Sequence, residues 1–104
     1  MIDLREKDRA AICELAQTHL PKGSEIWAYG SRVKGTHHDC SDLDLVVHFP
    51  PELDKLNSLT LLDNFIEALK ESNIPIIVQA LTWNSIPEHF QAGILERYEV
   101  LITM

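Results

Sequence analysis

Two short apolar segments that flank a polar loop limit most strongly what this chain can fold into. Residues 25–29 and 43–49 are rich in β-branched, aromatic and leucine side chains, and both are short for helices. The first segment stops at Gly30 and the second at Pro50-Pro51, so both are predicted to be strands. Two such strands need further elements to cover their sheet.

Two long segments supply helices for that purpose. Apolar residues recur at helical spacing over residues 3–20, and Asp3 with Glu6 has the spacing of a capping box at its start. Residues 56–72 show the same periodicity. Both segments are therefore predicted to be helices with one face on the sheet.

The last third of the chain completes the predicted fold. Residues 76–81 are predicted to be a third, largely buried strand. Ser85 and Glu88 have capping-box spacing and predict a helix over residues 87–99, after which 100–102 form a short strand or a frayed helix end. The order of elements predicts an α/β (α+β) fold, a small mixed sheet flanked by helices, with residues 1–104 as a single domain.

Charge and composition narrow the partners. With 16 acidic against 9 basic residues the formal net charge is −7, and no basic stripe is visible, so direct nucleic-acid binding is not expected. No apolar run approaches the ~20 residues of a membrane span, and no signal-peptide pattern begins the chain. Two cysteines make no disulfide framework, so a reducing cytoplasm is the expected location and no membrane association is expected.

The residues after the first strand suit a phosphate group. Gly30 leaves room for a ligand to approach the backbone, and Ser31 offers a hydroxyl and an N–H where a helical turn would begin. Arg32 and Lys34 add positive charge beside them. These four residues are the predicted seat of the terminal phosphates of a nucleotide.

The start of the second strand suits a metal ion. Asp42 and Asp44 are two residues apart, so their carboxylates project from one face while Leu43 and Leu45 enter the core. Two such carboxylates repel one another unless a cation lies between them, and Mg²⁺ prefers oxygen ligands. A predicted anion seat thus adjoins a predicted cation seat, as phosphoryl or nucleotidyl transfer requires.

Together these segments resemble the minimal nucleotidyltransferases of the DNA polymerase beta-like superfamily. The shared pattern is Gly30-Ser31-Arg32-x-x-Gly35, ten intervening residues, and then Asp42-Leu43-Asp44, within a chain of similar length and element order. The resemblance implies a polymerase beta-like palm fold, ATP and Mg²⁺ as ligands, and Asp42 and Asp44 as catalytic metal ligands. It also implies an antitoxin that transfers AMP to a tyrosine of a HEPN-domain toxin, with which it would form a hetero-oligomer.

One position departs from that pattern. Active members carry a third carboxylate on the strand after the middle helix, and the matching position here is Gln79. An amide carries no charge and is no base near pH 7, so turnover would be slowed or lost. The alternative is that the strand register differs and Gln79 fills a buried slot.

Other candidate residues have plainer interpretations. His37-His38-Asp39-Cys40 contains zinc-capable atoms, but adjacent residues rarely converge on one ion, so a solvated loop is favoured over a structural zinc site. His48 shares strand parity with Asp44, although a surface histidine is favoured there. The aromatic residues are expected to be core or partner contacts: Trp27, Tyr29, Trp83 and Phe90.

Two functions follow. The first is a Mg²⁺-dependent nucleotidyltransferase that moves AMP from ATP to a hydroxyl of a partner HEPN toxin, as the antitoxin of a toxin–antitoxin pair. The second is a catalytically weakened nucleotide-binding module that neutralises its partner by binding alone. Gln79 and the acidic composition motivate the second, because an acidic surface suits a basic RNA-cleaving partner.

Overall fold

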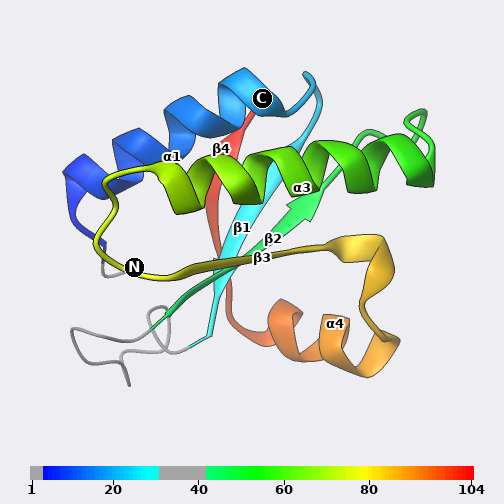
Figure 1. The fold of residues 1–104 in the computed structure, drawn as a ribbon. Coiled ribbons are helices and arrows are strands. Elements are labelled where there is room, and N and C mark those ends of the chain that lie inside the picture. The colour runs from blue at the N-terminus through cyan, green and yellow to red at the C-terminus, as the bar shows by residue number, and fades with distance from the viewer. Residues whose placement is uncertain (1–3, 31–41) are drawn as a thin grey trace.

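A computed structural model describes residues 4–30 and 42–104 of the chain (Figure 1). Its strands are short, as the apolar segments predicted, and its helices are the two long periodic segments and one shorter helix near the end. In chain order the elements are α1 Glu6–His19, β1 Glu25–Tyr29, β2 Leu43–His48, α3 Lys55–Glu71, β3 Val78–Thr82, the 3₁₀ turn η1 Trp83–Ser85, α4 Glu88–Glu96 and β4 Glu99–Thr103.

The strands form one mixed sheet in the order β3-β2-β1-β4. β1 pairs antiparallel with β2 and with β4, whereas β2 and β3 run parallel. The parallel pair needs a crossover connection, which α3 provides. The predicted fold class, a small mixed sheet flanked by helices, is confirmed, and the segment after the last helix is a strand.

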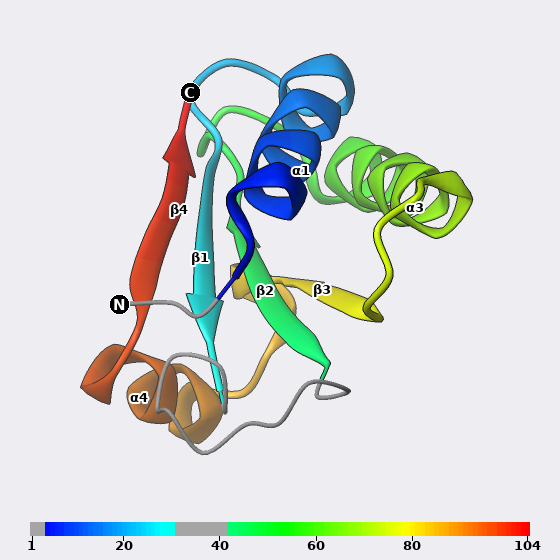
Figure 2. The same cartoon turned by 90° about the vertical axis from the view of Figure 1, so that its left-hand side faces the viewer.

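The helices lie on both sides of the sheet but cover it unequally. α1 and α3 pack side by side on one face, while α4 lies on the other side near the ends of β1 and β4 (Figure 2). The buried core lies under α1 and α3 and is apolar throughout: Ile12, Ala16, Leu20, Ile26, Ala28, Leu43, Leu45, Val47, Leu62, Phe65, Leu69, Ala80 and Leu101. The face opposite α1 and α3 is therefore left partly open.

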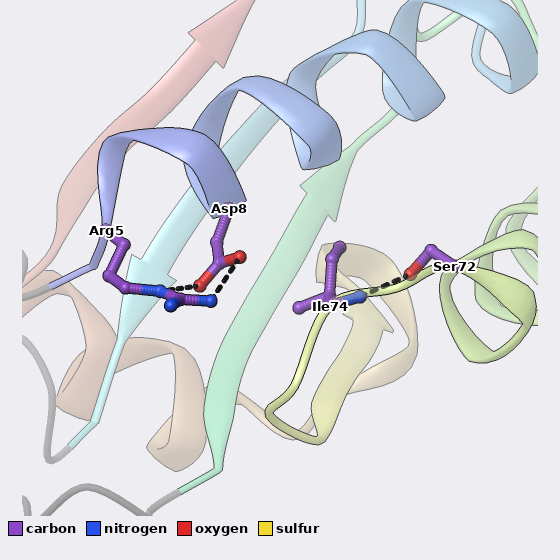
Figure 3. A network of polar contacts seen from close by, with 4 residues as sticks. All are labelled: Arg5, Asp8, Ser72 and Ile74. Carbon is purple, nitrogen blue, oxygen red and sulfur yellow. Dashed lines mark hydrogen bonds and ion pairs between the residues drawn. The ribbon is translucent and has the colours of Figure 1, made fainter.

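The predicted start of the first helix is wrong. α1 begins at Glu6, with Arg5 rather than Asp3 at the N-cap position and no side-chain cap. The Arg5 guanidinium donates instead to the buried Asp8 carboxylate, through Nε at 2.9 Å and Nη2 at 3.2 Å (Figure 3). Asp8 thus places its negative charge in the first turn, where the helix dipole favours it.

The predicted last helix is present, but its predicted C-terminal end and its capping box are wrong. α4 begins after Pro87 and ends at Glu96, because the backbone from Glu99 onward pairs with β1. The Ser85 hydroxyl does not cap α4 but donates to the Thr82 carbonyl at 3.0 Å, closing the 3₁₀ turn.

The predicted third strand is shorter and less buried than expected. β3 is an edge strand, with Gln79 and Leu81 exposed and only Ala80 and Thr82 buried. No helix in the described part of the chain is both long and apolar enough to cross a membrane.

Candidate active site on the open sheet face

Side chains of three strands form one row across the open face. Asp44 of β2 is the register partner of Tyr29 in β1 and of Gln79 in β3. Register partners project to the same side of a sheet, so a phenol, a carboxylate and an amide lie next to one another. Leu43 and Leu45 point to the opposite face and are fully buried, as predicted. Burial of these leucines fixes which way Asp44 points.

Asp42 joins this row from the segment just before β2. Its Oδ2 atom accepts a hydrogen bond of 2.7 Å from Nε2 of Gln79. Gln79 is exposed on the strand edge, so the alternative in which it fills a buried slot is wrong. It lies beside the two aspartates, where a third carboxylate would complete the set. A half-turn of its amide would present Oε1 instead of Nε2 to a cation.

Gly30 brings the end of β1 up against the second aspartate. Its φ of +85° lies in the left-handed region that glycine adopts readily. A Cβ built at this position would lie 2.5 Å from Oδ2 of Asp44, closer than real atoms approach. Gly30 therefore serves two purposes, since it turns the chain and leaves space for the Asp44 carboxylate.

The two acids affect each other. Burial raises the pKa of Asp44, and the charge of Asp42 raises it further. Burial also raises the pKa of Tyr29 to about 12, with the Asp44 charge adding to the effect. Tyr29 is therefore a neutral phenol near pH 7. A cation between Asp42 and Asp44 would relieve the repulsion between their negative charges.

Among the described residues, Asp42 and Asp44 are the carboxylates of the row, and Glu96 lies in the wall of the adjoining cavity. Within residues 4–30 and 42–104, no three His, Cys, Asp or Glu side chains gather as a metal-binding group. The nearest alternatives in sequence, Glu71 and Glu88, are the last residue of α3 and the first of α4. Neither replaces the missing carboxylate on β3, as the sequence predicted.

A cavity of about 320 Å³ opens beside this row, between the end of β1 and α4. Phe90 meets the Tyr29 ring edge-on, with ring centroids 5.9 Å apart and planes at 85°. Arg97 adds a cation at the C-terminal end of α4. The cavity is lined by Tyr29, Gly30, Phe90, Gly93, Ile94, Glu96 and Arg97. It is concave, mostly apolar and next to charged groups, which suits a nucleobase and ribose.

Sequence reasoning missed the contribution of α4. Gly93 and Arg97 lie more than sixty residues from Gly30, and no local motif links them. Phe90 was expected to be a core or partner contact, yet it lines the cavity. The local signal available was Gly93 itself, since glycine is disfavoured in the interior of an otherwise helical segment.

Several predicted residues lie outside the described part of the chain. These are the remaining members of the phosphate seat and the zinc-capable loop: Ser31, Arg32, Lys34, His37, His38, Asp39 and Cys40. The site as described is built from Gly30, Asp42, Asp44, Gln79 and the cavity wall.

An aromatic cluster continues along the open face from the row. Trp27 stacks on Tyr98 with centroids 4.1 Å apart and an interplanar angle of 15°, and it contacts His48 at 4.0 Å and Trp83 at 5.5 Å. His48 is thus not a surface histidine: it is half-buried on the same face as Asp44, and its Nε2 atom is buried without a hydrogen-bond partner among residues 4–30 and 42–104. Burial lowers the pKa of His48, against an opposing effect of Glu25.

Comparison with known proteins agrees with this geometry. Residues 9–102 match the family model described as nucleotidyltransferase domain. The chain is 34% identical over 100 residues to a Haemophilus influenzae protein named probable protein adenylyltransferase MntA, covering 96% of this chain and 83% of that protein.

Solved structures share the fold at lower identity. A toxin–antitoxin crystal structure with AMP-PNP superposes with a TM-score of 0.65 at 23% identity, over 92% of this chain and 73% of that one. The structure of a tri-AMPylated Shewanella oneidensis HEPN toxin in complex with an MNT antitoxin matches with a TM-score of 0.63 at 18% identity, over 97% of this chain and 74% of that one.

Proposed function

The chain belongs to the nucleotidyltransferase domain family, and from this premise we propose that it transfers AMP from ATP to a hydroxyl of a partner protein. The observation that carries the proposal is the contact of Gly30 with Asp44 beside a cavity large enough for a nucleoside. A relative at 34% identity is named as a probable protein adenylyltransferase, which supports AMP as the transferred group and a protein as the acceptor.

The residues present fit a divalent cation. Asp42 and Asp44 supply two carboxylates; burial raises the pKa of Asp44 most, and bound Mg²⁺ would remove the smaller part that the charge of Asp42 adds. When bound, Mg²⁺ would neutralise triphosphate charge and polarise the α-phosphate. Gln79 donates to Asp42 in the metal-free chain, and a half-turn of its amide would offer a neutral oxygen in place of a third charge.

The cavity wall positions the rest of the nucleotide. Tyr29 and Phe90 offer ring surfaces for the base, and Arg97 offers a cation for a phosphate or ribose oxygen. In the transfer itself, the acceptor oxygen forms a bond to the α-phosphorus, and the bond from that phosphorus to the bridging β-phosphate oxygen breaks. Pyrophosphate leaves, and the acceptor proton passes to water, because Gln79 cannot take it.

We further propose that the acceptor is a HEPN-type toxin and that the chain acts as its antitoxin. Similar folds are found in a complex of an MNT antitoxin with a HEPN toxin that carries AMP. The net charge of −7 suits a basic partner that handles RNA.

The test uses α-labelled ATP, Mg²⁺ and the protein encoded by the neighbouring gene, which this proposal expects to be a HEPN-domain protein. Label should become covalently attached to the partner, and Asp44→Asn should abolish attachment while the chain stays folded by circular dichroism. If the wild-type chain never transfers label although calorimetry shows MgATP binding, transfer is not its function.

Gln79 favours a second candidate, a nucleotide-binding module that neutralises its partner by occupancy alone. A missing general base typically lowers a rate by about 10²–10⁴-fold, enough to leave binding as the working activity. This candidate predicts that Asp44→Asn still suppresses the partner's nuclease activity. Loss of suppression in that variant would reject it.

A further inference from the structure

β3 ends the sheet with an unpaired edge. The Ile77 carbonyl accepts a hydrogen bond from the Leu43 N–H at 2.9 Å. Because backbone groups alternate in direction along a strand, every second residue from Ile77, that is Gln79 and Leu81, also turns its N–H and C=O toward β2. Val78 and Ala80 then turn theirs outward, where no other strand of the described chain pairs with them. Such an edge recognises an extended polypeptide through main-chain hydrogen bonds.

The usual protection of an edge strand is missing from β3. Its five residues, Val-Gln-Ala-Leu-Thr, include no charge and no proline. On the open face, Ile77 is 67% exposed and Leu81 is 39% exposed. These two apolar side chains lie on either side of Gln79, at two-residue spacing.

A second apolar feature adjoins the start of the strand. A cavity of about 310 Å³ lies between the end of α3 and the segment before β3, lined by Leu69, Lys70, Ile74, Ile76, Ile77 and Val78. Local hydrogen bonds hold its wall, since the Ile74 N–H donates to Oγ of Ser72 at 3.4 Å (Figure 3). The Ser72 hydroxyl in turn donates to the Leu69 carbonyl at 2.6 Å. The cavity would accept one apolar side chain of a segment paired with β3.

We propose that the outer edge of β3 docks an extended, uncharged segment of the acceptor polypeptide by strand addition, with Ile77 and Leu81 and the adjoining cavity gripping its side chains. This inference rests on the proposed transfer function, because it assigns the route of the acceptor. Gln79 donates to Asp42, so a segment paired along the outer edge of β3 passes beside Gln79, two strand spacings (roughly 10 Å) from Asp44. Docking at this edge therefore delivers a hydroxyl to the site while leaving the cavity between β1 and α4 to the nucleotide.

The test compares Ile77→Lys and Leu81→Lys with a matched control, Leu56→Lys, which alters a 73% exposed leucine at the start of α3. The partner is the purified HEPN-domain protein used above. Both β3 variants should bind it at least tenfold more weakly, whereas Leu56→Lys should bind as the wild type does. Calorimetry with MgATP should be unchanged in all three, so a failure of nucleotide binding is seen separately.

Amide hydrogen exchange gives a second readout that does not depend on a variant folding. The Val78 and Ala80 amides should exchange rapidly in the free chain and become protected when the partner binds. If a stable complex forms while both amides still exchange rapidly, the docking proposal is wrong. It is equally wrong if the chain alone forms a dimer that Leu81→Lys dissociates, because a second copy then covers the edge.

Discussion

A Cβ atom on Gly30 would lie 2.5 Å from Oδ2 of Asp44. The glycine backbone at the end of β1 and the carboxylate on β2 are therefore in direct contact, and this contact defines the corner of the candidate site. Asp44 is fixed from its other side by its register with Gln79. The carboxylate position thus depends on the absence of a side chain at one residue.

Gly30→Ala should lower the free energy of unfolding and abolish MgATP binding. A left-handed backbone costs a non-glycine residue roughly 1–2 kcal/mol, and the added methyl must also displace the Asp44 carboxylate. Urea unfolding and calorimetry measure the two effects.

Gly93→Ala is the matched comparison for stability. A Cβ there meets nothing within 4 Å, and alanine is favoured over glycine in a helix interior by roughly 0.5–1 kcal/mol. Its free energy of unfolding should therefore rise. Equal destabilisation of both variants would mean that the contact with Asp44 is not what requires a glycine at residue 30.

Gln79→Asp should increase transfer. The substitution places a carboxylate beside Asp42 and Asp44, and it restores a group that can hold a second cation or accept the acceptor proton. The rate of label transfer should rise by about 10²–10⁴-fold.

Gln79→Ala separates this gain from simple loss of the hydrogen bond to Asp42. It should transfer no faster than the wild type. If Gln79→Asp and Gln79→Ala behave alike, the amide position has no part in the limiting step.

Asp44→Asn should stabilise the metal-free chain while removing its response to Mg²⁺. Folding raises the pKa of Asp44. Its carboxyl group therefore contributes most to stability at pH values below its unfolded-state pKa of 3.8. As the pH rises through the raised value, the buried charge costs stability, and at neutral pH that cost is fully present. Thermal unfolding at pH 7 should show a higher Tm for the variant without Mg²⁺ and no further rise with it. A lower Tm without metal would contradict the assigned burial of this charge.

Local patterns in the sequence predicted those parts of the site that are close together in the chain. Gly30, Asp42 and Asp44 flank two strands, and strand parity alone was enough to put both carboxylates on one face. Gln79 was identified because the family resemblance implies a third carboxylate on the strand after the middle helix, and the register shows that this residue is the neighbour of Asp44.

What the sequence did not reveal depends on contacts across the whole chain. Trp27 and Tyr98 stack across β1 and the start of β4, although seventy residues separate them in sequence. The capping box of Ser85 was mistaken because Pro87 holds the N-cap position of α4, while Ser85 lies in the preceding 3₁₀ turn and its hydroxyl donates to the Thr82 carbonyl. The edge position of β3 follows from sheet order, which strand periodicity does not specify.

His48 should make the free energy of unfolding depend on pH. Its ring packs between Trp27 and Trp83, with Nε2 buried and unpaired, and burial lowers its pKa below the ordinary 6.5 even though Glu25 opposes the shift. The folded chain therefore favours the neutral imidazole of His48. The free energy of unfolding should be highest above pH 6.5. It should fall as the pH drops from 6.5 toward the lower folded-state pKa, because in this range the unfolded chain binds a proton that the folded chain does not.

His48→Phe tests this dependence. The substitution keeps a ring in the cluster, removes the buried Nε2 atom, and should raise the free energy of unfolding at pH 8 by about 1 kcal/mol. Urea unfolding between pH 5 and 8 should show that the advantage of the variant grows as the pH falls. A difference between the two proteins that stays constant over this range would show that His48 does not titrate within the cluster.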